Sequence, residues 1–225
     1  MDPMERSKKA VAEHAANFVK EGMVVGLGSG STANWMIKRL GERVQEGLNI
    51  KGIPSSFKSE RLAAECGIPL TDFSSVDKID IAIDGADEVD SDLQLLKGGG
   101  GSLVREKIVD GEAEQLIIIV DETKIVTRLG EFPLPIEVTP FGWELTAENI
   151  SNLGGKPKLR HLDGEIFVTN NDNYILDCKF PGIQKPAELH ASLKLLTGVV
   201  ETGLFINMAD QIIIAKQDGI EILTK

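Results

Sequence analysis

Residues 23–32 read Met23-Val24-Val25-Gly26-Leu27-Gly28-Ser29-Gly30-Ser31-Thr32, and this stretch decides the fold class of the chain. Its apolar first half, residues 23–27, has the length of a buried strand, and its second half is a Gly/Ser/Thr turn. A helical pattern follows at about 33–44, and another at about 6–21 precedes the strand and ends at Gly22. The stretch therefore predicts a strand that runs through a tight turn into the N-terminus of a helix.

The same pattern recurs along the first half of the chain. Short apolar runs at 50–53, 79–83 and 116–120 alternate with helical stretches at 60–66 and 102–109. Alternating strands and helices are typical of a sheet whose strands are parallel and covered by helices on both faces. We therefore expect an α/β fold with a doubly wound, mostly parallel Rossmann-like sheet.

A different pattern begins after Arg128, where Phe132-Pro133-Leu134-Pro135 interrupts the chain. The elements that follow read strand, helix, strand, strand, helix, strand up to about Leu204, with helices at 143–153 and 187–196 and a turn at Asn170-Asn171-Asp172-Asn173. This order predicts an inserted, smaller ferredoxin-like α+β domain.

Two late strands, 211–215 and 220–223, are expected to rejoin the first sheet. The predicted domains are accordingly a catalytic Rossmann-like domain at 1–131, a smaller ferredoxin-like domain at 132–205, and C-terminal strands at 206–225 that return to the catalytic domain.

Composition excludes several classes of function. The 225 residues carry 24 Lys and Arg against 35 Asp and Glu, a net charge of −11, which disfavours nucleic acid and anionic membranes as partners. Cys66 and Cys178 form no Cys-x-x-Cys pair, and so few thiols in a chain of this length favour a reducing compartment. We expect both thiols to be buried and unreactive. The first residues lack a basic segment followed by an apolar one, so we expect a cytoplasmic protein.

Four polar clusters stand out, and each is expected at or just beyond the C-terminal end of a predicted strand. Ligands of open α/β sheets bind outside those ends, so the clusters are expected to converge on one site. They are Gly28–Thr32, Asp84-Gly85-Ala86-Asp87-Glu88, Lys97-Gly98-Gly99-Gly100-Gly101 leading to Glu106, and Asp121-Glu122-Thr123-Lys124.

The first cluster has three interpretations. Gly28-Ser29-Gly30-Ser31-Thr32-Ala33 fits the G-x-G-x-x-G/A pattern of nicotinamide dehydrogenases, but the acid expected after the second strand is missing, where the chain reads Ile53-Pro54-Ser55-Ser56-Phe57. Hydroxyls and free N–H groups at a helix start suit a single phosphate equally well. The third interpretation is an N-capped turn without a ligand.

The second cluster places three acids within five residues, which is typical of a solvated turn or of a divalent-metal site. His14, His161 and His190 are isolated in the sequence, so Mg²⁺ is the one credible metal and a Mg²⁺-dependent phosphohydrolase is an alternative function.

The third cluster places four consecutive glycines after Lys97, which allows a ligand to approach the backbone closely. The lysine precedes the glycines, so the order of a P-loop is absent. Glu106 follows on a predicted helix between Arg105 and Lys107, and a lone helical glutamate is normally a surface charge.

A close resemblance to ribose-5-phosphate isomerase type A is carried together by four segments. They are Gly28–Ala33, Asp84–Glu88, Lys97–Lys107 and Phe132-Pro133-Leu134-Pro135. Residues 198–205, Gly198-Val199-Val200-Glu201-Thr202-Gly203-Leu204-Phe205, also resemble that family, so the resemblance covers nearly the whole chain. It implies interconversion of ribose 5-phosphate and ribulose 5-phosphate in the non-oxidative branch of the pentose phosphate pathway. It also implies a homodimer or homotetramer that needs no metal and no organic cofactor.

Residue by residue, the resemblance makes Glu106 the proton acceptor. Lys97, Asp84 and Asp87 are further catalytic candidates, which the chemistry of the reaction suggests. The resemblance leaves Lys8 as a weakly supported phosphate contact. The substrate-binding residues that it implies are Ser29, Gly30, Ser31, Thr32, Asp84, Gly85, Ala86, Asp87, Lys97, Gly98, Gly99, Gly100 and Lys124.

The chemistry agrees with these residue types. A free glutamate is ionised at neutral pH and is thus ready to take a carbon-bound proton. The enediolate that results carries negative charge, which the Lys97 ammonium and N–H groups from Gly98 to Gly100 would stabilise. Asp84 and Asp87 are candidates for opening the furanose ring, and the residue types do not assign which one takes the anomeric proton and which one protonates the ring oxygen. A sensor that binds a sugar phosphate without turnover is a third alternative, although no basic stripe accompanies the site.

Overall fold

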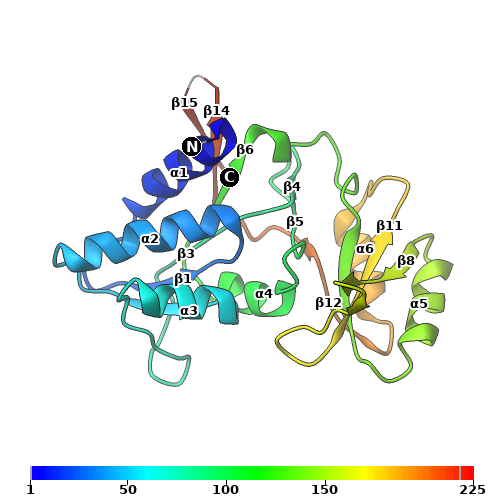
Figure 1. The fold of residues 1–225 in the computed structure, drawn as a ribbon. Coiled ribbons are helices and arrows are strands. Elements are labelled where there is room, and N and C mark those ends of the chain that lie inside the picture. Colours follow the sequence, from blue (N-terminus) through cyan, green and yellow to red (C-terminus); the bar gives the residue numbers. More distant parts are fainter. Residues whose placement is uncertain (1, 218) are drawn as a thin grey trace. The chain divides into compact units, whose positions relative to one another are not determined.

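The computed structural model describes residues 2–217 and 219–225. The chain forms two compact units (Figure 1). Unit 1 is the described part of Met1–Ala86, Arg105–Lys124 and Met208–Lys225, and unit 2 is Asp87–Val104 and Ile125–Asn207. The chain thus changes unit after Ala86, Val104, Lys124 and Asn207.

A six-stranded sheet forms the centre of unit 1, in the order β15-β14-β6-β3-β1-β2. Every neighbouring pair is parallel except the C-terminal hairpin β14–β15. The prediction of a mostly parallel sheet is therefore confirmed, and β14 and β15 lie at one edge of this sheet. The strands are β1 Val24–Leu27, β2 Lys51–Pro54, β3 Ile81–Asp84, β6 Leu116–Asp121, β14 Gln211–Lys216 and β15 Gly219–Thr224.

Helices cover both faces of this sheet. Val25 and Leu27 of β1 face a core to which α1 and α2 contribute, and these two helices lie side by side in Figure 1. Gly26 faces the other way, toward Val109 of α4, because successive strand residues point to opposite faces. The doubly wound prediction is confirmed. The helices are α1 Pro3–Ala16, α2 Ser31–Gln45, α3 Phe57–Glu65, α4 Leu103–Gly111 and the short 3-10 helix η1 Glu122–Lys124.

The first helix ends five residues earlier than the sequence predicts, at Ala16 instead of residue 21. Arg43 of α2 explains the early end, because its Nη1 donates to the carbonyl oxygens of Ala16 and Val19. These bonds satisfy carbonyls that a continuing helix would have used. The chain then turns so that Val19, 1% exposed, enters the core.

Unit 2 contains a four-stranded antiparallel sheet in the order β12-β7-β11-β8. Its main elements run strand, helix, strand, strand, helix, strand along the chain, so the ferredoxin-like prediction is confirmed. They are β7 Leu134–Val138, α5 Trp143–Asn152, β8 Lys156–Leu159, β11 Tyr174–Lys179, α6 Pro186–Lys194 and β12 Val199–Thr202, with a small hairpin of β9 His161–Leu162 and β10 Glu165–Ile166.

A second, three-stranded sheet of unit 2 has the order β13-β5-β4 and pairs distant parts of the sequence. Its strands are β4 Glu88–Val89, β5 Leu95–Leu96 and β13 Leu204–Phe205. Residues 87–104 and 125–131, which the sequence prediction assigns to the first domain, belong to unit 2. The domain boundaries at 131/132 and 205/206 stay predictions.

Candidate active site

Three of the four predicted clusters begin at the carboxyl ends of adjacent parallel strands. Gly28 follows β1, Asp84 ends β3 and Asp121 ends β6, and these strands are neighbours in the order β6-β3-β1. Lys97–Gly101 also lie just beyond the end of a strand, but that strand is β5, in the small antiparallel sheet of unit 2. Residues 88–96 pair as an antiparallel hairpin instead of adding a strand to the parallel sheet.

Asp84 organises the turn after β1. Its side chain is fully buried, and its Oδ1 accepts hydrogen bonds from the N–H groups of Ser29 at 2.9 Å and Gly85 at 2.7 Å. Gly28 lies so close that a β-carbon at this position would collide with the Asp84 carboxyl group. The glycine that opens the motif is therefore needed for close approach to the next strand.

The Ser29 hydroxyl belongs to a network of hydroxyls that sequence reasoning missed. Its Oγ lies 2.9 Å from Ser55 Oγ and donates to Ser56 Oγ at 2.8 Å, and both of these serines are buried. Ser56 also caps the N-terminus of α3 together with Ser59. The signal is present in the sequence, because Ser55 and Ser56 follow β2, the strand beside β1, and hydroxyls at that edge can reach the turn after β1.

The N-terminus of α2 is open to an anion. Gly30 is the N-cap with a φ of +100°, and no side chain caps the helix and no acid lies in its first turn. Ser31 is exposed and Thr32 is half-buried. Free N–H groups at the positive end of the helix dipole favour a phosphate at such a position.

Two lysines of unit 1 are predicted to hold phosphate. Lys124 is half-buried at the end of η1. Lys8 is 15% exposed and pairs with Glu5 at 3.0 Å, and Glu5 in turn accepts a hydrogen bond from Trp35 Nε1 at 2.9 Å. These hydrogen bonds and the Lys8 charge lower the pKa of Glu5.

Glu106 lies on α4 and is only 4% exposed. The interpretation of this residue as an ordinary surface charge is therefore wrong. Burying an ionisable side chain is costly, so a glutamate at such a position is typical of a functional site or of a structural network.

Lys97 is equally buried, at 2% exposure, within unit 2. Its Nζ lies 5.2 Å from the centre of the Phe205 ring, and its backbone N–H donates to the carbonyl of Gly203 at 2.9 Å. Asp87 is half-buried, and its Oδ2 accepts the N–H of Gly99 at 2.7 Å. Of the three glycine N–H groups expected to face a ligand, that of Gly99 therefore donates to Asp87 instead.

The chain itself requires three of the four glycines. Gly98 and Gly101 have φ values of +103° and +87°, and a β-carbon on Gly99 would collide with Asp87. Gly100 is exposed and has no positive φ, and a β-carbon added there would have no atom within 4 Å. Nothing in the fold demands glycine at this position, which is expected where a ligand approaches the backbone.

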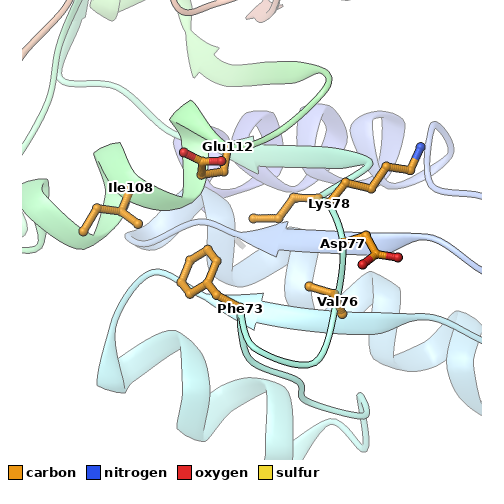
Figure 2. Close-up of a pocket in the computed structure, with 7 residues that line it drawn as sticks. Phe73, Val76, Asp77, Lys78, Ile108 and Glu112 are labelled. Atoms are coloured by element: carbon orange, nitrogen blue, oxygen red, sulfur yellow. The ribbon is translucent and has the colours of Figure 1, made fainter.

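One cavity of unit 1 lies elsewhere. It has a volume of about 590 Å³, and in Figure 2 the ring of Phe73 points toward the α4 segment that carries Ile108. Ile79 also lines it and precedes β3, so the cavity is at the amino end of that strand, whereas Asp84 is at the carboxyl end. No predicted site residue lines it. Its lining residues are Phe73, Val76, Asp77, Lys78, Ile79, Ile108 and Glu112.

The described residues offer neither a metal-ligand cluster nor a membrane-spanning helix. Within residues 2–217 and 219–225, no three His, Cys, Asp or Glu side chains are grouped so that they could hold a metal ion. Over the same residues, no helix is both long and apolar enough to cross a membrane.

A family model and curated relatives match this chain. Residues 51–219 match the family model of ribose 5-phosphate isomerase A, also called phosphoriboisomerase A. The chain is 55% identical to ribose-5-phosphate isomerase A 1 of Oceanobacillus iheyensis, over 99% of this chain and 100% of the relative. It is 54% identical to ribose-5-phosphate isomerase A of Gluconobacter oxydans, over 97% and 96% of the two chains.

Solved structures of ribose 5-phosphate isomerases also superimpose on this chain. A D-ribose-5-phosphate isomerase in complex with phospho-erythronic acid superimposes with a TM-score of 0.96 at 40% identity and covers 100% of both chains. Ribose 5-phosphate isomerase from Plasmodium falciparum gives a TM-score of 0.95 at 42% identity over 99% of both chains. The likeness extends through both units, and the chain belongs to the ribose 5-phosphate isomerase A family.

Proposed function

We propose that this chain interconverts D-ribose 5-phosphate and D-ribulose 5-phosphate, as an aldose–ketose isomerase of the non-oxidative pentose phosphate pathway. The observation that carries the proposal is the match to ribose-5-phosphate isomerase A over 99% of the chain at 55% identity. The activity requires removal of the proton on C2, an enediolate, and return of a proton to C1.

Glu106 is the proposed base. It removes the C2 proton and gives a proton to C1, so the carboxylate is regenerated at the end of each turnover. Its burial supports this role, because a buried ionisable side chain is typical of a functional site.

Lys97 and the glycine loop are proposed to stabilise the enediolate. In the described part of the chain, the N–H groups of Gly98 and Gly100 have no hydrogen-bond acceptor, whereas that of Gly99 donates to Asp87. The donors proposed for a developing oxyanion are the N–H groups of Gly98 and Gly100, together with the Lys97 ammonium.

Asp84 and Asp87 are proposed to open the furanose ring, which needs one group to take the anomeric proton and another to protonate the ring oxygen. Their surroundings differ, since Asp84 holds the turn after β1 and Asp87 holds the glycine loop. Asp84 accepts two backbone N–H groups and Asp87 accepts one, and this favours well-defined positions for proton transfer.

The phosphate is proposed to bind at Ser31, Thr32 and Lys124, with Lys8 as a further contact. The open N-terminus of α2 supports this position. A competing role for this turn in nicotinamide binding is disfavoured, because Ser55 and Ser56 stand where the ribose-binding acid would be and bond to Ser29 instead. If the phosphate site is correct, inorganic phosphate competes with substrate and unphosphorylated ribose is a far poorer substrate.

The remaining proposals concern the location, the oligomeric state and the metal requirement of the enzyme. We propose a cytoplasmic homodimer or homotetramer that acts without a metal ion, and light scattering on the purified protein gives its oligomeric state. Exhaustive chelation is expected to leave kcat unchanged. A chelated enzyme that recovers only when Mg²⁺ is added back would refute the metal-free mechanism.

The decisive experiment measures ribulose 5-phosphate formation and the exchange of the substrate C2 proton with deuterated solvent. Wild type should do both, whereas Glu106→Gln should lose about 10²- to 10⁴-fold in kcat with KM little changed. Glu60→Gln, an exposed glutamate of unit 1, is the control. If Glu106→Gln exchanges the C2 proton at the wild-type rate, another residue is the base.

A further inference from the structure

The carbonyl side of the glycine loop is held by a residue that has no place in the proposed chemistry. Arg160 Nη1 donates to the carbonyl oxygens of both Gly98 and Gly99 at 3.1 Å. Its other donors, Nε and Nη2, bind the two oxygens of Asp177 at 2.9 and 2.5 Å. One guanidinium group therefore joins the loop to strand β11.

The Arg160 side chain and its partner Asp177 are held by their surroundings. The Arg160 side chain is 12% exposed, and its guanidinium lies 5.7 Å from the centre of the Phe167 ring. The same ring fills the space that a β-carbon on Gly101 would need. Asp177 lies in the middle of a sheet, paired with Pro135 and Lys158 on its two sides. The bidentate geometry fixes the orientation of the guanidinium as well as its position.

Because Arg160 binds the carbonyl oxygens of Gly98 and Gly99, the geometry of the peptide bond determines where the next N–H groups point. The C=O and N–H of a trans peptide point in opposite directions, and the described chain contains no cis peptide. Because the Gly99 carbonyl faces Arg160, the N–H of Gly100 points away from it. Because the Gly98 carbonyl also faces Arg160, the N–H of Gly99 is turned to Asp87. The guanidinium charge further polarises both peptide groups and strengthens them as donors.

We propose that Arg160, oriented by Asp177, is a positioning residue that presents the N–H of Gly100 to the substrate and to the enediolate. The inference rests on the proposed role of the glycine loop. A lysine cannot replace this arginine, because an ammonium group cannot bind a carboxylate through two nitrogens and two carbonyls at the same time.

The test compares Arg160→Lys with wild type by kcat, KM and the midpoint of thermal unfolding. Kinetics are measured well below the lowest midpoint of the set, so that all variants are fully folded. We expect kcat to fall by about 10²-fold, the loss typical when a catalytic group is misplaced from a distance. Arg128→Lys, an exposed arginine of the same unit, is the matched control and should keep wild-type kinetics. An unchanged kcat in Arg160→Lys, whatever its melting midpoint, overturns the proposal.

A second arm separates positioning from a general effect on stability. If Arg160 acts through the loop, its effect is already partly lost in Gly100→Ala, so the double variant should be much less impaired than the product of the two single losses. Losses that multiply overturn the proposal. A Gly100→Ala variant with wild-type kcat and KM would instead remove the loop from the proposed site. An impaired Gly100→Ala with a wild-type Arg160→Lys would leave the isomerase site standing and reject Arg160 alone.

Discussion

Gly28 and Asp84 are packed so tightly that the carboxyl group of the aspartate occupies the place where a side chain on residue 28 would begin. The contact joins the ends of two adjacent parallel strands, β1 and β3. It also brings the N–H of Ser29 to Asp84 Oδ1 at 2.9 Å. The turn that the sequence indicates as a ligand-binding motif thus also packs against the end of the neighbouring strand.

Gly28→Ala should therefore destabilise unit 1. A methyl group forced against the buried carboxylate is expected to cost about 1–3 kcal/mol, as overpacking of a well-packed interior typically does. Urea unfolding measures the change, with Gly100→Ala as the control that adds the same methyl group in open space. Equal midpoints for the two variants would contradict the close approach.

Gly100→Ala should leave stability unchanged and impair activity. Its unfolding midpoint should match wild type, because no atom lies within 4 Å of the added β-carbon and the φ of residue 100 is not positive. Its KM should rise or its kcat should fall, since the methyl group obstructs the approach of substrate to the loop. Gly111→Ala, whose β-carbon would meet Met208 at an ordinary 3.5 Å, is the control and should retain full activity.

Glu137 should be a major determinant of the stability of unit 2. The fully buried carboxylate accepts hydrogen bonds through Oε1 from Thr169 at 3.0 Å, Asn173 at 2.9 Å and Asn171 at 3.3 Å. Glu137→Leu leaves these donors without their acceptor and should cost at least about 2 kcal/mol in urea unfolding. Glu137→Gln keeps a carbonyl oxygen and should cost less.

The control for that series is Glu188→Leu, which breaks an ion pair with Lys185 in which both side chains are 70% exposed. An exposed pair contributes about 0–1 kcal/mol, so its loss should be small. If Glu137→Leu and Glu188→Leu unfold at the same urea concentration, the buried network contributes nothing.

The two cysteines should differ in reactivity. Burial raises the pKa of both thiols above the ordinary value, but Cys178 is fully buried whereas Cys66 is half-buried, so the expectation of two buried thiols is wrong for Cys66. Iodoacetamide should alkylate Cys66 first, as read by peptide mass spectrometry. The rate at Cys66 should rise with pH, because a raised pKa leaves little of the reactive thiolate below it. Faster labelling of Cys178 in the folded enzyme would contradict the predicted order.

The sequence by itself determined the architecture. The helix expected at 33–44 is α2 Ser31–Gln45, and the strand expected at 116–120 is β6 Leu116–Asp121. Such agreement is physical, because apolar periodicity and turn chemistry are local properties that a short window of sequence contains. The order of alternating elements then determined a parallel sheet, and with it the shared edge that carries Gly28, Asp84 and Asp121.

Only the tertiary structure decided which of the charged residues are buried and what holds the glycine loop. Glu106 has the sequence surroundings of a surface glutamate, yet it is 4% exposed, because burial depends on what packs over a helix and not on the helix itself. Arg160 reaches a carbonyl oxygen 62 positions earlier in the chain, at Gly98. No local pattern encodes such a contact, since it exists only after strands distant in sequence have paired and placed Asp177 beside it.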